Sequence, residues 1–242
     1  MTAVGIDLAW STRGRTGVAE LDGAGRLVRV GTLRSDGELD AWIGDTEPSV
    51  VGIDATIVVV NESGSRPCEK AIARAFGRFD AGPYPSNRSN PIFDPPRACA
   101  IARRHGWSLD PEADVRPLAL EVYPHAAMVG LFRLGRVIPY KARPRRSLAD
   151  RIAAFGVLCD HLESVATLQL ARSAEYAGLR RAITAATRPV DLAIVEDQLD
   201  AIVCAYVAWL WQHDRTALRL YGDAATGFIV APPAPDRPPS PR

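Results

Sequence analysis

Two segments that we expect to be buried strands end in the same three residues, Gly-Ile-Asp. Segment 3–9 is a short apolar run interrupted by Asp7, and segment 49–54 is a second apolar run that ends at Asp54. An unpaired carboxylate among buried apolar side chains costs several kcal/mol. Because ligand sites in open α/β sheets form at the carboxyl ends of strands, the two matching ends indicate one shared site. The alternative is that each aspartate caps a turn by accepting hydrogen bonds from nearby backbone N–H groups.

The order of the predicted elements indicates an α/β fold. Apolar residues predict strands over 16–21 and 26–33, joined by an Asp-Gly-Ala-Gly turn, so the first three strands form an antiparallel unit. A helix over 36–44 then leads to strand 49–54, which we expect to be parallel to the first strand. With a fifth strand over 117–122, this order favours a mixed sheet flanked by helices.

The rest of the chain is mostly helical. Further helices are predicted over 65–78, 94–105, 125–132, 147–162, 171–186 and 191–213, and a last short strand over 227–230. We expect residues 1–230 to form a single domain with helical insertions, since 242 residues allow one large domain. Residues 231–242 contain six prolines and are predicted to form a disordered tail.

The last long helix carries acids along the edge of its apolar stripe. Glu196, Asp197 and Asp200 fall within about 100° of one another on a helix with 3.6 residues per turn. Like charges at these spacings repel by a few tenths of a kcal/mol, and a divalent cation would reverse that cost. The alternative is that these acids are stabilised by the helix dipole near the N-terminus of the helix. This explains Asp191, which lies in the first turn, but explains Asp200, which lies further along the helix, poorly. Carboxylates without histidine or cysteine partners are typical ligands of Mg²⁺ or Mn²⁺.

The charges balance over the chain but not along it. The 29 basic and 28 acidic residues give a net charge of +1, which does not indicate a globally cationic nucleic-acid binder. Basic residues are nevertheless concentrated in one segment: Arg133, Arg136, Lys141, Arg143, Arg145, Arg146 and Arg151. Arginine suits phosphate, and Phe132 and Tyr140 can stack on bases, so this segment is the predicted nucleic-acid contact. The alternative is a solvated loop and helix start.

The sequence also restricts the cellular location. No stretch approaches the roughly 20 apolar residues of a membrane helix, and the acid at position 7 comes too early for a signal peptide. The four cysteines lie far apart and at no metal-binding spacing from the histidines. We therefore expect reduced thiols in a cytoplasmic protein without a membrane partner.

The order of the acids resembles that of the ribonuclease H-like superfamily. In that superfamily, acids lie at the ends of the first and fourth strands and on a late helix, which here match Asp7, Asp54, and Asp197 with Asp200. The i,i+3 pair is similar to that of Holliday-junction resolvases of the RuvC type. More closely, the chain resembles a prokaryotic family of unknown function described as predicted RNase H-like nucleases. The matching motifs are G-I-D-L-A-W (5–10), G-I-D-A (52–55), R-P-C-E (66–69), L-E-V-Y-P (120–124), Y-K (140–141), D-Q-L-D-A-I-V-C-A (197–205) and G-F-I-V-A-P (227–232).

The resemblance implies a ribonuclease H-like mixed sheet and a Mg²⁺- or Mn²⁺-dependent nuclease that hydrolyses phosphodiester bonds in DNA or RNA. Its metal ligands would be Asp7, Asp54, Asp197 and Asp200, and Glu121 is an outer catalytic candidate. Glu121 lies in the fifth predicted strand, where a charge needs a partner, either a metal ion or an arginine. A homodimer is compatible with the resemblance, since RuvC-type enzymes act as dimers.

Two other functions remain open at this stage. The chain can be a binding module that kept the fold without the chemistry, or a small-molecule phosphotransferase or phosphatase. Two features argue against a phosphotransferase or phosphatase. Gly14 and Gly17 lie further after Asp7 than the glycines of a phosphate-binding hairpin would, and no G-x-x-x-x-G-K-[ST] motif is present. Arg66 and Glu69 either face a substrate or form a pair at a helix start. His125 stands where family members often carry glutamate, and it is either a general base or a structural residue.

Overall fold

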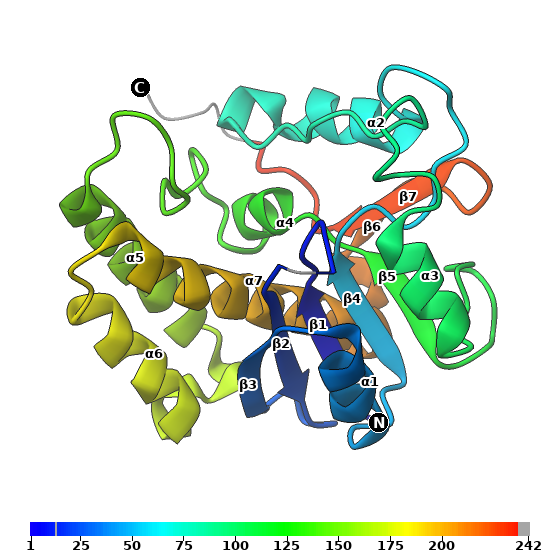
Figure 1. The fold of residues 1–242 in the computed structure, drawn as a ribbon. Helices are drawn as coiled ribbons and strands as arrows, with labels where there is room; N and C mark the ends of the chain where they lie inside the picture. The colour runs from blue at the N-terminus through cyan, green and yellow to red at the C-terminus, as the bar shows by residue number, and fades with distance from the viewer. Residues whose placement is uncertain (13, 237–242) are drawn as a thin grey trace.

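The structure, a computed structural model, describes residues 1–12 and 14–236 and contains a five-stranded sheet in the order β3-β2-β1-β4-β5 (Figure 1). The strands are β1 (Ala3–Asp7), β2 (Thr16–Leu21), β3 (Leu27–Leu33), β4 (Val50–Asp54) and β5 (Leu118–Glu121). The first three strands pair antiparallel, whereas β4 is parallel to β1 and β5 is parallel to β4. The predicted mixed α/β sheet is therefore confirmed, and it is compatible with a ribonuclease H-like fold.

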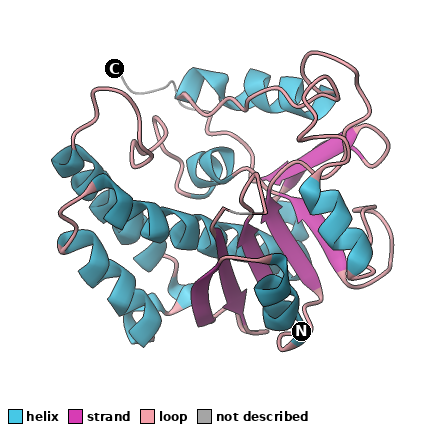
Figure 2. Cartoon of the chain, in the orientation of Figure 1, coloured by secondary structure: helices cyan, strands magenta, loops and turns pink. Residues whose placement is uncertain are grey.

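Helices cover both faces of this sheet (Figures 1 and 2). The α-helices of the described chain are α1 (Asp36–Gly44), α2 (Pro67–Phe76), α3 (Arg97–Arg104), α4 (Pro124–Leu131), α5 (Leu148–Glu163), α6 (Ala174–Thr184) and α7 (Pro189–His213). Helices α1 and α3 pack on one face, and the long helix α7 crosses the other face with α4, α5 and α6 around it. None of the helices in the described part of the chain combines the length and the apolar character that a membrane span requires.

Strand residues alternate between these two layers, as the period of a β-strand demands. In β1, Val4 and Ile6 join the core under α1 and α3, whereas Ala3 joins the core under α7. Asp7 has the same parity as Ala3 and therefore faces the α7 side. Asp54 lies opposite Asp7 in the parallel ladder, so both acids end their strands on the same face.

Three glycines let the backbone of α7 lie directly on the sheet. A Cβ atom on Gly5 would come within 1.9 Å of the Ala201 carbonyl oxygen of α7. A Cβ atom on Gly17 would come within 2.0 Å of the Asp197 carbonyl oxygen, which also belongs to α7. Gly52 on β4 meets α7 in the same way, through the carbonyl of Cys204. Only a residue without a side chain permits this approach, so the glycine of each Gly-Ile-Asp motif positions α7 over the strand ends.

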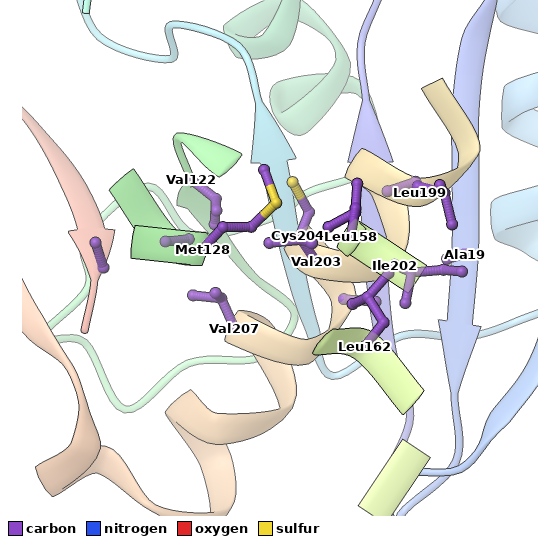
Figure 3. Close-up of a cluster of buried hydrophobic side chains, with 14 of the residues drawn as sticks. Ala19, Val122, Met128, Leu158, Leu162, Leu199, Ile202, Val203, Cys204 and Val207 are labelled. Carbon is purple, nitrogen blue, oxygen red and sulfur yellow. The ribbon is translucent and has the colours of Figure 1, made fainter. Parts of the chain in front are cut away.

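The largest apolar core lies on the α7 side of the sheet. Figure 3 shows Leu199, Ile202 and Val203 of α7 among side chains of the neighbouring helices, including Met128 of α4 and Leu158 of α5. All five are fully buried. Burying a side chain of this size contributes roughly 1.5–3 kcal/mol, so this layer fixes the position of α7.

The C-terminal region differs from its prediction. Instead of one strand, β6 (Arg219–Asp223) and β7 (Gly227–Ala231) form a separate antiparallel hairpin that packs against α2. The hairpin was missed because β6 is largely exposed and has no apolar alternation. The proline-rich tail begins at Ala231 within β7, and the carbonyl of Pro235 accepts a hydrogen bond from Arg78. Residues 237–242 of the predicted tail lie outside the described residues.

Replacing Gly5 by alanine tests the contact between α7 and the sheet. Because the added Cβ would meet backbone atoms that cannot rotate away, we expect Gly5→Ala to lower the free energy of unfolding by about 3 kcal/mol. Gly31→Ala on β3 is the control, since its Cβ would meet only a Val18 methyl group at 3.8 Å. Urea unfolding followed by circular dichroism measures both variants, and equal stability of the two would contradict the packing argument.

Candidate metal centre

Three carboxylates meet where β1 and β4 end. Asp7 and Asp54 are register partners on these strands, and α7 brings Asp200 to the same point. One carboxylate oxygen of each residue lies within 4.8 Å of the others, a grouping that can hold a metal ion. We call Asp7, Asp54 and Asp200 the acid cluster. The structure thus brings together three of the four metal ligands that the sequence predicts.

Burial makes this cluster electrostatically costly. Desolvation, together with the charges of Asp54 and Asp200, raises the pKa of Asp7 well above its ordinary value. Desolvation also raises the pKa of Asp54 to about 7, although the nearby Lys141 ammonium lowers it. Neither Asp7 nor Asp54 makes a side-chain hydrogen bond with any residue that the structure describes. The two strand-end aspartates are therefore not turn caps, and their negative charge is open to protons or a cation.

Asp200 has the closest partners of the three. It is fully buried, the Tyr140 hydroxyl donates a hydrogen bond of 2.6 Å to its Oδ1, and Lys141 Nζ lies 2.7 Å from its Oδ2. Although burial alone lowers the pKa of Lys141, the carboxylates of the acid cluster raise it well above its usual range. The basic pattern of the segment predicts that Lys141 binds nucleic acid and that Tyr140 stacks on bases. In the structure, both residues hold Asp200.

Glu196 and Asp197, the acids that precede Asp200 on α7, are paired separately. Arg15 Nε lies 3.5 Å from Asp197 Oδ2, and Arg151 Nη2 lies 3.1 Å from Glu196 Oε2. Burial raises the pKa of Asp197 to about 6 even though Arg15 lowers it. Asp197 is almost one helical turn before Asp200, and its carboxylate is not part of the acid cluster. A helical wheel places these acids on one side but cannot reveal their different partners.

Of the two partners predicted for Glu121, a metal ion or an arginine, the structure shows the arginine, Arg66. Arg66 donates to both oxygens of Glu121, at 2.9 and 2.5 Å, and the backbone N–H of Ile57 donates to Oε2 at 2.9 Å. The same arginine donates to Glu69 Oε1 at 2.9 Å, and Glu69 also accepts from the Ser86 N–H. This buried network ties two loops to α2 and β5. Arg66 and Glu69 thus form a helix-start pair that also braces the loops.

Strand parity explains why Glu121 does not join the acid cluster. Glu121 is the register partner of Ile53, whose side chain packs in the core under α1 and α3. Asp54 is one residue further along β4 and points to the opposite face. Both acids come at the end of a strand, but they lie on opposite faces of the sheet.

Asp7 and Asp54 of the acid cluster line a cleft of about 550 Å³, whereas the fully buried Asp200 lies behind them and does not line it. The lining of this cleft includes Arg66, Glu69 and Glu121. It also includes Tyr123 and His125, which come shortly after β5 in the chain. Burial, with the charges of Lys141 and Arg143, lowers the pKa of His125 to about 3, so this ring is neutral near pH 7. The His125 ring packs edge-on against Tyr123 and Tyr140. His125 therefore supports the tyrosine that holds Asp200.

The predicted basic segment is divided between two neighbouring hollows and a buried position. Arg143 lines the cleft beside Lys141, whereas Arg145 and Arg146 line a second hollow of about 910 Å³ together with Arg136. Arg136 forms an ion pair with Asp80, and Arg133 is exposed at the start of the segment. Arg151 is buried and donates to the Tyr140 carbonyl oxygen. Pro144 lines both cavities, so the loop around it separates the cleft from the second hollow.

The Arg66 network generates a prediction about stability. Arg66→Met keeps most of the side-chain volume but leaves two buried carboxylates without their cation, so we expect a loss of about 3–5 kcal/mol. Arg88→Met is the matched control, since Arg88 faces the exposed Glu62 at 3.5 Å and should cost at most about 1 kcal/mol. Urea unfolding gives both values, and a loss below about 1 kcal/mol for Arg66→Met would refute the bracing role.

The raised pKa of Asp54 generates a prediction about pH. In the folded state Asp54 holds its proton up to about pH 7, whereas in the unfolded state it releases the proton near pH 4. Between these values the folded state binds more protons, so ionisation of Asp54 lowers stability as the pH rises. We expect wild type to lose a few kcal/mol relative to Asp54→Asn between about pH 4 and pH 7 without divalent ions.

Asp223→Asn is the control for this series, because hydrogen bonds from Thr226 lower the pKa of Asp223 instead. Its stability relative to wild type should stay constant across the same window. Chemical unfolding at several pH values measures both differences. A constant difference between wild type and Asp54→Asn would mean that Asp54 ionises normally.

Comparisons with known proteins identify a family but no function. No curated protein and no solved structure matches the chain. One family matches over residues 5–226, which covers both Gly-Ile-Asp motifs and all three residues of the acid cluster. The chain belongs to this family, which is described as a protein of unknown function (DUF429).

Proposed function

We propose that the protein is a divalent-metal-dependent nuclease that hydrolyses phosphodiester bonds in nucleic acid. The observation that carries this proposal is the acid cluster, in which Asp7, Asp54 and Asp200 place carboxylate oxygens within 4.8 Å of one another beside a cleft. The donor set consists of oxygen atoms alone, which suits Mg²⁺ or Mn²⁺. These three aspartates would hold the ion.

The residues around the acid cluster support this chemistry. A Mg²⁺ or Mn²⁺ ion bound there would polarise a phosphodiester and lower the pKa of water. Tyr140 fixes the orientation of Asp200 through a 2.6 Å hydrogen bond, so one ligand is held in place before any ion binds. Lys141 and Arg143 line the cleft and can donate to phosphate oxygens. Asp7 and Asp54 have no cation at ion-pair distance among the described residues, and their charge favours a divalent ion.

One observation favours a second candidate, a binding module without catalysis. The Lys141 ammonium already lies 2.7 Å from Asp200, and an amine at this position balances part of the charge that an ion would balance. If Lys141 serves as a permanent substitute for the ion, the cleft binds its ligand without divalent ions. The two functions are distinguished experimentally, because cleavage by the nuclease requires a divalent ion, whereas ligand binding by the binding module does not.

Asp7→Asn tests the nuclease proposal. The substitution removes one negative charge and one metal ligand from a site where desolvation already disfavours the charge, so the protein should remain folded. We expect its cleavage of single-stranded and structured DNA and RNA to fall by about 10³-fold or more, equal to about 4 kcal/mol of transition-state stabilisation. Asp191→Asn, an acid near the start of α7 that pairs with Arg188, is the control and should cleave like wild type.

A thermal-shift titration with Mn²⁺ completes this test. An ion that binds only the folded wild type at 100 times its dissociation constant stabilises it by about 2.7 kcal/mol. Asp7→Asn should show a much smaller shift. Equal cleavage by wild type and Asp7→Asn, or no Mn²⁺-dependent shift in wild type, would refute the nuclease and favour the binding module.

A further inference from the structure

Two exposed aromatic side chains line the same cleft as Asp7 and Asp54 of the acid cluster. Trp10 is 64% exposed and Tyr84 is 72% exposed. They come from loops far apart in the sequence, yet both line this cleft. Among the described residues, the other large apolar side chains that are clearly exposed are aliphatic. Isolated exposed apolar side chains are ordinary, but two exposed aromatic rings that line one cleft indicate a planar ligand.

Hydrogen bonds from Arg97 hold the backbone on both sides of Trp10. Arg97 donates from Nη1 to the carbonyl oxygens of Ala9 and Ser11, at 2.7 and 3.3 Å, and thus clamps the residues on both sides of Trp10. Arg97 is itself fixed by an ion pair with Asp36 of α1. The Trp10 ring packs against Phe93 with 5.6 Å between ring centroids. The indole is therefore presented at the surface by a braced backbone, which reduces the entropy that a ligand must overcome.

The position of Trp10 connects it to the proposed chemistry. It follows Asp7 by three residues on the same strand-end loop, and Arg143 lines the same cleft. A nucleotide has a planar base and an anionic phosphate, which match an aromatic wall and an arginine. Within a duplex the bases are stacked on one another and cannot reach a protein ring. A base that stacks on Trp10 must be unpaired.

We propose that Trp10 and Tyr84 form a binding subsite for an unpaired nucleobase, so that the substrate is a single-stranded or extrahelical nucleotide. This inference rests on the proposed nuclease function and deepens it, because it selects unpaired strands over intact duplex. Stacking on an aromatic ring tolerates any base, since every base has a π face. The subsite therefore selects the unpaired state and not the sequence.

The test is fluorescence anisotropy with labelled oligonucleotides in EDTA, so that binding is separated from cleavage. The probes are single-stranded DNA, single-stranded RNA, the same DNA as a blunt duplex, an abasic strand and a nucleoside monophosphate as competitor. We expect Trp10→Ala to weaken single-strand binding by about tenfold or more, and Trp10→Phe to retain most of it. Binding of the duplex and of the abasic strand should be weak and unchanged by either substitution.

Val28→Ala is the control for loss of exposed apolar surface, because Val28 is 46% exposed on β3 and does not line the cleft. It should bind every probe like wild type. The DNA and RNA probes identify the polymer, and effective competition by the monophosphate would identify a free nucleotide as the source of the base. The thermal midpoints of all variants show that each is folded.

Failure of this inference is separable from failure of the nuclease proposal. If wild type cleaves nucleic acid but Trp10→Ala binds single strands as wild type does, the base subsite is wrong and the nuclease stands. If binding depends on Trp10 but no cleavage occurs with Mg²⁺ or Mn²⁺, the base subsite is correct and the nuclease proposal is wrong. Tighter binding of duplex than of single strands would overturn the subsite in either case.

Discussion

The close contact between the α7 backbone and three glycines of the sheet is the constraint on which the site depends. Gly5, Gly17 and Gly52 lie on three neighbouring strands, and each leaves space for a carbonyl of α7. Side chains at these positions would push the helix away from the sheet. The same contact brings Asp200 to the ends of β1 and β4, so packing and the acid cluster have one structural origin.

The electrostatics of the acid cluster follow from this close packing. Three carboxylates enter a desolvated region, and among the described residues Lys141 is the basic side chain within ion-pair distance of them. One positive charge does not balance three negative charges, and the raised pKa values of Asp7 and Asp54 express this imbalance. By contrast, Arg66 lies between Glu69 and Glu121 and donates hydrogen bonds to all four of their carboxylate oxygens, so these oxygens are already occupied. The two acidic groups lie close in the fold, but they differ in what they can bind.

Local patterns were sufficient to predict the mixed sheet and the convergence of Asp7 and Asp54, whereas the resemblance to the ribonuclease H-like superfamily placed Asp200 beside them. Apolar runs gave the strands, and the rule that sites form at strand ends gave the location. The position of Glu121 was also open to prediction, because strand parity places it on the face opposite Asp54. The partners of Asp197 and Asp200 were not, because Arg15 and Lys141 reach α7 from distant loops through tertiary packing. Hairpin β6–β7 was missed because the exposed β6 has no apolar pattern.

The central claim is that the acid cluster holds a divalent cation. Anomalous diffraction from crystals soaked in Mn²⁺ tests it most directly, because the signal locates the ion without assumptions about activity. We expect one anomalous peak within about 2.0–2.5 Å of carboxylate oxygens of Asp7, Asp54 and Asp200. An empty cluster at saturating Mn²⁺, with Lys141 still paired to Asp200, would contradict it.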